Sequence, residues 1–372
     1  MSDGSSLSDK PDVSILECTL RDGSYAVNFQ FTSADTEDIA TALDEVGFPF
    51  IEVGHGIGLG ASEAGLGEAA ESDENYMKAT ASAVKRGKWG MFCIPGVATL
   101  EHVDMARDYE MDFIRVGTNV NEAELAAPFV ERAKKYGMFV ATNFMKSYAV
   151  PPKEMGLAAK AAASYGADMV YVVDSAGGML TQELSTYFKA VQDVTDVMLG
   201  FHGHNNLQLA VANSLMAAEM GVAVGDSSLQ GFGRSSGNTP TELILLSLLR
   251  AGFNQDIDPI AVLDIGERCV RPLIDAKGLY SLDMVCGYAQ FHSSYMGLVR
   301  EMSSRHKVDP RKLIIEICRH DLLAAEPEFV DQTARNMAAN AAASDVSTAR
   351  FRMERYHGQE EMVPSSEQAD DA

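Results

Sequence analysis

The sequence predicts an α/β fold, a (β/α)8 TIM barrel followed by a small C-terminal helical domain. Short apolar runs rich in Val, Ile and Phe recur along most of the 372 residues without polar alternation, as expected for parallel strands covered on both faces. Ala-rich segments of helical period lie between these runs, and repeated βα units of this number close most economically into a barrel. After about residue 286 the strand signal stops and helical patterns take over.

Eight segments are the candidate strands of this barrel. An open doubly wound sheet is the main alternative, but it would require a glycine-rich phosphate turn after the first strand. The sequence Arg-Asp-Gly-Ser at 21–24 is not such a turn. The predicted strands span residues 14–20, 50–54, 90–94, 113–116, 139–144, 169–173, 198–202 and, with a weaker pattern, 222–229.

The first predicted helix, residues 36–46, has recognisable signals at both ends. Its apolar residues recur at intervals of three and four, which places them on one face. Thr32 and Asp35 form a capping box before it, and Gly47 stands where a helix-terminating glycine belongs. The segment is therefore expected to be an amphipathic helix packed on the sheet.

The chain divides into four predicted parts. Residues 1–11 form a disordered N-terminal tail, and residues 12–285 form the catalytic barrel. Residues 286–355 form the helical C-terminal domain. Residues 356–372 are acidic and without periodicity, which is typical of a disordered tail.

Composition excludes several classes of function. With 30 Lys and Arg against 53 Asp and Glu, the formal charge is −23, and no basic stripe is present for nucleic acid. No run approaches the roughly 18 apolar residues of a membrane span, and no signal region begins the chain, so we expect a cytoplasmic protein without a membrane partner. The five cysteines are scattered without C-x-x-C spacing, which indicates reduced thiols rather than disulfides or a zinc ribbon.

Ionisable residues gather where the predicted strands end, which is where a barrel builds its active site. His202 and His204 lie two residues apart on a strand and so point to the same face. Asp22, after the first strand, would add a carboxylate, and such a set suits Mn²⁺, Mg²⁺, Co²⁺ or Zn²⁺. Arg21 beside it can hold a keto acid carboxylate or stabilise an enolate. The plainer interpretations are a turn cap for Asp22 and a surface ion pair for Arg21.

Several motifs in order resemble the DRE-TIM metallolyases, and most closely the 4-hydroxy-2-oxovalerate (4-hydroxy-2-oxoacid) aldolases. The resemblance covers about residues 13–342. It is carried by the sequences ECTLRDGSYAVNFQF, IEVGHGIGL, VDSAGGM, GFHGHNNLQLAVANS, GNTPTE and LDMVCGYAQFHSSYMG.

The resemblance implies a divalent-metal, class II aldolase that cleaves or forms a 4-hydroxy-2-oxo acid from pyruvate, or a related 2-oxo acid, and an aldehyde by way of a metal-bound enolate. Mn²⁺ is the metal expected first. Asp22, His202 and His204 match the metal ligands. Arg21 matches the arginine that stabilises the enolate, and Ser175 matches a serine beside the keto acid.

The resemblance also implies partners. Such aldolases often pair with an acylating aldehyde dehydrogenase, to which the aldehyde is channelled, and the helical domain contributes to that assembly. We further expect a homo-oligomer, and His55 is expected in the substrate pocket.

This chain departs from the family in two coupled positions. Tyr25 stands where these aldolases carry a catalytic histidine, and His292 stands where they carry a tyrosine. If both side chains face one cavity, the acid–base pair is retained with its positions exchanged; otherwise the pair is lost and the substrate or reaction differs. Neutral imidazole is a workable base near pH 7, whereas Tyr, with an ordinary pKa near 10, needs help to ionise.

Other functions remain open from the sequence. A Claisen-type condensing enzyme of the same superfamily, acting on a 2-oxo acid and an acyl-CoA, is the enzymatic alternative, as is a variant acting on another carbonyl substrate. Lys146 raises a Schiff-base aldolase. The ligand types would also suit an Fe(II) oxygenase, and the altered pair would suit a non-enzymatic scaffold.

Overall fold

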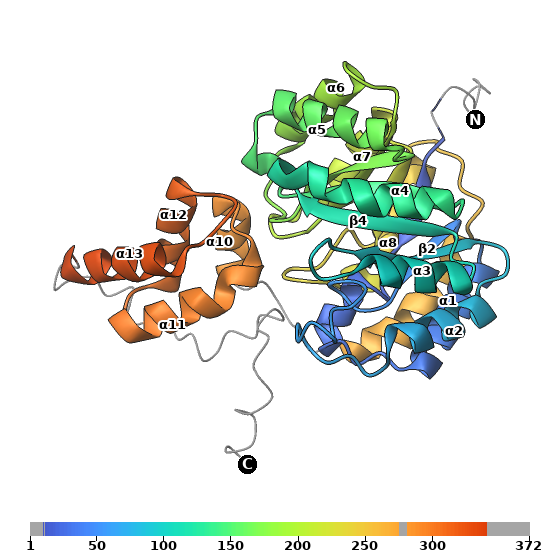
Figure 1. The fold of residues 1–372 in the computed structure, drawn as a ribbon, viewed down its shortest axis with the longest axis horizontal. Coiled ribbons are helices and arrows are strands. Elements are labelled where there is room, and N and C mark those ends of the chain that lie inside the picture. The colour runs from blue at the N-terminus through green and yellow to red at the C-terminus, as the bar shows by residue number, and fades with distance from the viewer. Residues whose placement is uncertain (1–9, 11, 275–280, 341–372) are drawn as a thin grey trace, which may run out of the picture.

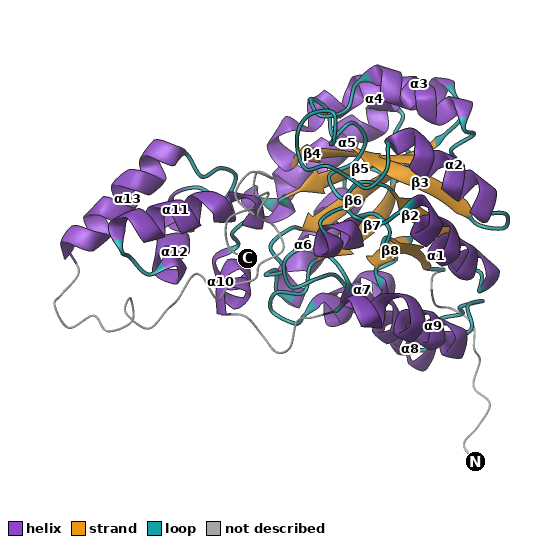
Figure 2. Ribbon diagram, turned by 90° about the horizontal axis from the view of Figure 1, so that it is seen from below, coloured by secondary structure: helices purple, strands orange, loops and turns teal. Residues whose placement is uncertain are grey.

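In the computed structural model, which describes residues 10, 12–274 and 281–340, eight parallel strands form a closed barrel in chain order, and β1 pairs with β8 (Figures 1 and 2). This confirms the predicted fold class. The strands are β1 (Ser14–Glu17), β2 (Phe50–Val53), β3 (Lys88–Cys93), β4 (Phe113–Asn119), β5 (Phe139–Met145), β6 (Met169–Asp174), β7 (Met198–Gly203) and β8 (Val224–Ser227).

The helices between the strands cover the outside of the barrel (Figure 2). They bury an apolar core of Leu, Ile, Val, Phe and Ala between themselves and the sheet. They are α1 (Ser33–Glu45), α2 (Asp73–Ala83), α3 (Leu100–Asp108), α4 (Ala127–Lys135), α5 (Pro152–Tyr165), α6 (Thr181–Gln192), α7 (Ala210–Glu219), α8 (Thr241–Arg250) and α9 (Pro259–Ile265).

Helix α1 begins as its capping signals predict. Thr32 and Asp35 form the capping box, and each side chain accepts a hydrogen bond from the other's backbone N–H. The helix starts at Ser33, three residues before the predicted boundary, because the cap and not the first apolar residue sets the start. Gly47 follows the last turn with φ +97°, a left-handed conformation that favours glycine.

All eight predicted strands are present, and the largest difference in length is at β8, predicted at residues 222–229 and observed at Val224–Ser227. Strand β1 is also shorter than predicted. The predicted strand extends to residue 20, whereas β1 ends at Glu17. Beyond it the backbone N–H groups of Arg21, Asp22 and Gly23 all turn back toward the Cys18 carbonyl. This turn leads into a short 3₁₀ helix, Asp22–Val27, and carries the side chains at the end of β1 into the mouth of the barrel.

A buried carboxylate joins β1 to the segment after β8. Glu17 is fully buried and accepts hydrogen bonds from the N–H and hydroxyl of Thr19, the N–H of Leu229 and the hydroxyl of Thr241, at 2.6 to 3.2 Å. These donors satisfy the carboxyl group where the barrel closes. Burial still dominates, and it raises the pKa of Glu17 to about 7.

The C-terminal helices form a second apolar core beside the barrel (Figure 1). The first buried residue of this second core is Leu282. The boundary at residue 285 stays a prediction, and the predicted tails lie outside the described residues except for Lys10. Among the helices that the structure describes, none is long and apolar enough to cross a membrane. The helices of this second core are α10 (Ser281–Ala289), α11 (Met296–His306), α12 (Pro310–His320) and α13 (Pro327–Asn340).

Helix α10 is held against the barrel by a close backbone approach. A Cβ atom added at Gly178, after β6, would lie 2.1 Å from the carbonyl oxygen of Gly287 in α10. A side chain at Gly178 would prevent this approach, and a Cβ at Gly287 would lie 2.9 Å from Asn206 in the loop after β7. The approach fixes the C-terminal helices over the carboxyl ends of the strands.

We expect Glu17 to make the stability of the protein depend on pH. Its pKa is about 7 in the fold and near 4.5 in an unfolded chain, so the folded state holds the proton more tightly. The free energy of unfolding should therefore fall as pH rises from about 4.5 to 7, by about 3 kcal/mol from this group. Thermal unfolding of Glu17→Gln should show a smaller loss between pH 5 and pH 8 than wild type. An equal loss in both proteins would contradict the assignment.

Candidate active site

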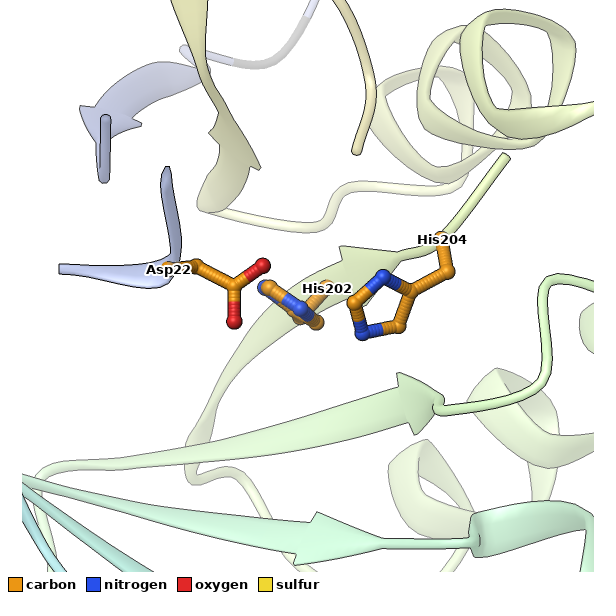
Figure 3. A group of neighbouring side chains, drawn as sticks. All are labelled: Asp22, His202 and His204. Carbon is orange, nitrogen blue, oxygen red and sulfur yellow. The ribbon is translucent and has the colours of Figure 1, made fainter. Parts of the chain in front are cut away.

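Three buried side chains converge at the carboxyl ends of β1 and β7. One ligand atom from each of Asp22, His202 and His204 lies within 4.8 Å of the others. Figure 3 shows the carboxylate and the two imidazoles directed toward one another. Two imidazole nitrogens and one carboxylate oxygen form a donor set that suits a divalent metal ion. The structure thus brings together the residues that the sequence predicts as metal ligands.

Hydrogen bonds orient both imidazoles toward this point. His202 Nδ1 contacts Asp226 at 2.8 Å, and His204 Nδ1 lies 3.3 Å from the Gly237 carbonyl. In each ring the other nitrogen, Nε2, is then the one available to a metal, because the acceptor at Nδ1 holds the proton there. The Asp22 carboxylate is held by the Asn238 side-chain amide, which donates to Oδ2 at 2.7 Å.

An ion network inside the barrel supports these ligands. Arg21 donates to Glu52 at 2.6 Å and to Asp22 at 2.8 Å. Arg115 donates twice to Glu52, at 2.7 and 2.8 Å, and once to Asp226 at 2.5 Å. All five of these side chains are at least about nine-tenths buried. The network therefore links β1, β2, β4 and β8 beneath the site.

The network was not recognised in the sequence, although a signal was present. Glu52, Arg115 and Asp226 are charged residues within short strands that are otherwise uncharged. A charge in a parallel strand covered on both faces must be paired in the barrel interior. Three such positions in separate strands would have indicated a buried network.

The charges of the site reinforce one another. Burial alone would raise the pKa of Asp22, but Arg21, the two histidines and Arg234 hold it well below its ordinary value. Burial likewise opposes ionisation of Asp226, and Arg115 lowers the pKa of that carboxyl. Both carboxyl groups are therefore ionised at neutral pH, as ligation by Asp22 and support of His202 require.

A cavity of about 960 Å³ opens over this site. Its size suits a small organic ligand. Seven of the eight residues predicted for the site line it: Arg21, Asp22, Tyr25, Ser175, His202, His204 and His292. Residues of the barrel and of the C-terminal helices thus face one space.

His55, the eighth, is placed differently. Both its ring nitrogens contact the backbone, Nδ1 with the N–H of Ile57 and Nε2 with the carbonyl of Gly67. Its ring is stacked on Phe29 at 3.9 Å, and burial lowers the pKa of His55 to about 4. This geometry favours a role in holding the loop after β2, and a substrate contact by His55 stays a prediction.

Tyr25 and His292 face the same cavity, which is the geometric condition for an exchanged pair. Gly56 leaves room for the Tyr25 ring, since a Cβ there would lie 2.6 Å from it. His292 Nδ1 lies 2.7 Å from the Ser294 hydroxyl. Burial and the adjacent Arg234 lower the pKa of His292 well below its ordinary value, so the imidazole is neutral.

Arg234, in the loop between β8 and α8, was not among the predicted site residues. It lines the cavity, donating to His292 Nε2 at 2.9 Å and lying 3.3 Å from His204 Nε2. Its guanidinium lies 5.9 Å from the centre of the Tyr25 ring. No spacing signal marks this residue in the sequence, because a single arginine in a glycine-rich loop looks like a surface residue.

Lys146, which directly follows β5, also lines the cavity. Its ammonium group donates to the Tyr295 hydroxyl at 3.2 Å and to the Leu323 carbonyl at 2.7 Å. Burial, aided by Arg234, lowers the pKa of Lys146 to about 8, so it is largely charged at neutral pH. It therefore places a cation between the barrel and the C-terminal helices.

Comparison with known proteins identifies the family. The HMGL-like family matches residues 12–268, which is more than half of the chain. The chain belongs to the HMGL-like family. This confirms the resemblance seen in the sequence motifs.

Three similar proteins are named as 4-hydroxy-2-oxovalerate aldolases. A 4-hydroxy-2-oxovalerate aldolase of Carboxydothermus hydrogenoformans is 36% identical over 86% of this chain and 95% of its own length. The protein of that name from Geobacillus genomosp. 3 is 34% identical over 89% of this chain and 98% of its own. The 4-hydroxy-2-oxovalerate aldolase 2 of Rhodococcus jostii is 36% identical over 88% and 95%.

Solved structures share the fold of this HMGL-like protein at lower identity. The HMG-CoA lyase of Brucella melitensis has a TM-score of 0.61 and 18% identity, over 71% of this chain and 99% of its own. The carboxyl transferase domain of Rhizobium etli pyruvate carboxylase has a TM-score of 0.71 and 17% identity, over 91% of this chain and 62% of its own. At these identities the likeness establishes the fold alone.

We expect Asp226→Asn to destabilise the protein strongly. The change would leave Arg115 buried with one carboxylate partner removed, and breaking a buried ion pair in this way costs about 3–5 kcal/mol. Urea denaturation measures the free energy of unfolding. Asp108→Asn, which breaks the exposed pair with Arg107, is the matched control and should change little. Equal stabilities of the two variants would refute the supporting role of the network.

Proposed function

We propose that this protein is a divalent-metal-dependent, class II aldolase, a carbon–carbon lyase acting on 4-hydroxy-2-oxo acids. The observation that carries the proposal is the convergence of Asp22, His202 and His204 beside Arg21 at the base of a ligand-sized cavity. The shared name of relatives aligned over almost their whole length supports it. The substrate is split into pyruvate, or a related 2-oxo acid, and an aldehyde, or is formed from them.

Asp22, His202 and His204 would hold the metal, and Mn²⁺ is the ion we propose first, since Mg²⁺, Co²⁺ and Zn²⁺ would suit the same donors. When bound, such an ion polarises the C2 carbonyl of the keto acid as a Lewis acid. The protein's part is to fix the three ligands, which the Asp226 and Asn238 contacts do.

Arg21 and Ser175 are the proposed contacts for the keto acid end. Glu52 and Asp22 fix the Arg21 guanidinium at the cavity wall, and they raise the pKa of Arg21 although burial opposes this. A cation held in place before the reaction stabilises negative charge as it develops, here the enolate left on pyruvate. Ser175 lines the same wall and accepts the Lys146 backbone N–H.

The proton transfers fall to His292 and Tyr25. Cleavage removes the proton from the C4 hydroxyl, breaks the C3–C4 bond and leaves the electron pair in an enolate that is then protonated at C3. Neutral His292 suits the base at C4, and Tyr25 suits the proton donor at C3. Because Arg234 donates to Nε2, that nitrogen carries no proton, and it can accept the hydroxyl proton once the guanidinium turns away from it.

The resemblance adds two partners to the proposal. We propose that the aldehyde passes to an acylating aldehyde dehydrogenase and that the protein forms a homo-oligomer. Both concern surfaces outside the cavity, and neither is needed for the cleavage step.

The function is tested by pyruvate release from a panel of 4-hydroxy-2-oxo acids, coupled to lactate dehydrogenase. We expect release that stops after EDTA treatment and returns with Mn²⁺ or Co²⁺. Asp22→Asn should lose both the activity and Mn²⁺ binding measured by calorimetry, because one of three ligands is weakened, whereas Asp108→Asn should keep both. No release from metal-loaded protein would move the assignment to a condensing reaction or another carbonyl substrate.

The exchanged pair has its own test. Tyr25→Phe and His292→Ala should each lower kcat by about 100-fold, the usual cost of losing a general acid or base. Tyr109→Phe and His320→Ala, outside the cavity, are the matched controls. Turnover within threefold of wild type in both pair variants would exclude proton transfer by this pair.

A further inference from the structure

The cavity is more cationic than the reaction at the keto acid end requires. Besides Arg21, the cations Arg234, Lys146 and Arg300 line it. Arg234 contacts His292, the proposed base. Two acidic side chains, Asp22 and Glu301, line the cavity as well. Asp22 belongs to the candidate metal site, and Glu301 accepts a hydrogen bond from Arg305 outside the cavity.

Arg234 is built into the cavity wall by a tightly folded loop. At Gly233 a Cβ would lie 2.3 Å from the Asn238 amide and 2.9 Å from the Asp22 carboxylate. At Gly237, which has φ +81°, a Cβ would lie 2.0 Å from the Gly231 carbonyl oxygen. The loop therefore wraps closely around Asp22 and leaves Arg234 about nine-tenths buried, facing inward. A flexible surface arginine would not be held this way.

The groups that Arg234 contacts include neutral acceptors that the reaction itself needs. Its guanidinium faces Nε2 of His204 and Nε2 of His292. The first nitrogen is a candidate metal ligand, and the second is the proposed base. Nη2 also lies 3.4 Å from the Ser175 carbonyl oxygen. When the two imidazole lone pairs are used in the reaction, the guanidinium is released from both, and an anion is a stronger partner for it than a neutral acceptor.

Lys146 is a second fixed cation in the cavity wall. Its backbone adopts a left-handed conformation with φ +58°, which non-glycine residues rarely take. Its ammonium group is anchored by Tyr295 and by the Leu323 carbonyl, both neutral groups of the C-terminal part. Burial and then the charge of Arg234 lower the pKa of Lys146, so the two cations repel and an anion between them would be stabilised by both.

The position of His292, the proposed base, indicates which part of the substrate Arg234 would contact. His292 takes the proton from the C4 hydroxyl in the proposed function, so C4 lies next to Nε2 when substrate is bound. Arg234 Nη1 lies 2.9 Å from that nitrogen. The substituent on C4, which becomes the rest of the aldehyde, thus falls within reach of the guanidinium.

We propose that the C4 substituent carries an anionic group, a carboxylate or a phosphate, recognised by Arg234 and assisted by Lys146. The substrate class is then a 4-hydroxy-2-oxo acid with a second anion on the aldehyde side. This inference rests on the proposed function and specifies its substrate. The cleavage itself is unchanged: the C3–C4 bond breaks, its electrons pass to pyruvate, and an anionic aldehyde leaves.

Binding of two matched, uncleavable keto acids tests the site without turnover. 2-Oxoglutarate and 2-oxopentanoate have the same chain length and lack the C4 hydroxyl, and they differ in a terminal carboxylate against a methyl group. Calorimetry on the Mn²⁺-loaded full chain should show 2-oxoglutarate binding about 10-fold or more tightly, the value of one charge-assisted pair. Arg234→Met should abolish this preference and Arg234→Lys should keep part of it. Arg107→Met, which removes an exposed cation outside the cavity, should keep it all.

Cleavage of three substrates separates the two anion sources. We expect 4-hydroxy-2-oxoglutarate, or 4,5-dihydroxy-2-oxohexanoate 6-phosphate, to be cleaved with a kcat/KM about 10-fold or more above that of 4-hydroxy-2-oxopentanoate. The better of the first two identifies the anion as carboxylate or phosphate. The ratio of anionic to neutral substrate within each variant is the readout, so a general loss of activity in Arg234→Met cancels.

Three outcomes would contradict the anionic substituent, the placement of Arg234 or the aldolase activity itself. Equal binding of both keto acids to wild type, with the neutral substrate cleaved at least as well, would refute the anionic substituent and leave the aldolase intact. An equal loss of both keto acids in Arg234→Met would place the arginine at the keto acid end instead. Selective 2-oxoglutarate binding with no pyruvate from any substrate would refute the aldolase and support recognition of a second anion.

Discussion

Two arginines and two carboxylates paired inside the barrel are the constraint on which the active site depends. Arg21 and Arg115 share Glu52, and Arg115 also holds Asp226, so that charges from β2, β4, β8 and the turn after β1 pair with one another. Pairing of this kind is costly to break because each partner would remain charged in a region of low dielectric. The same contacts orient His202 through Asp226 and position Asp22 beside Arg21. The proposed metal ligands are thus positioned by the interior of the barrel itself.

The site needs both parts of the chain. The barrel supplies the ligand set and Arg21, while His292 and the anchor for Lys146 come from beyond residue 290. The contact of Gly178 with Gly287 fixes one part against the other at the carboxyl ends of the strands. Geometry at the scale of a proton transfer therefore depends on packing between the two cores, and not on the barrel alone.

Much of this could be predicted from the sequence, and the remainder could not for physical reasons. Repeated apolar runs and the capping box at Thr32 are local patterns, and they gave eight strands and the start of α1. The histidines at 202 and 204 and Asp22 follow strand ends, so the topology of a barrel brings them together. The position of Arg234 depends instead on how its loop folds around Asp22. The position of the Lys146 ammonium group depends on the Leu323 carbonyl, which is distant in the sequence. His55 shows the converse, since a strand-end histidine turned its nitrogens to the backbone.

The Glu17 contacts also bear on how the protein folds. The carboxylate at the end of β1 finds donors at Leu229 and Thr241, more than 200 residues later in the chain. Until β8 and the segment after it are in place, that carboxylate stays in water and the barrel has two open edges. Contacts of such sequence separation are slow to form because a long loop must first close. The barrel is therefore expected to close late in folding, when β8 pairs with β1.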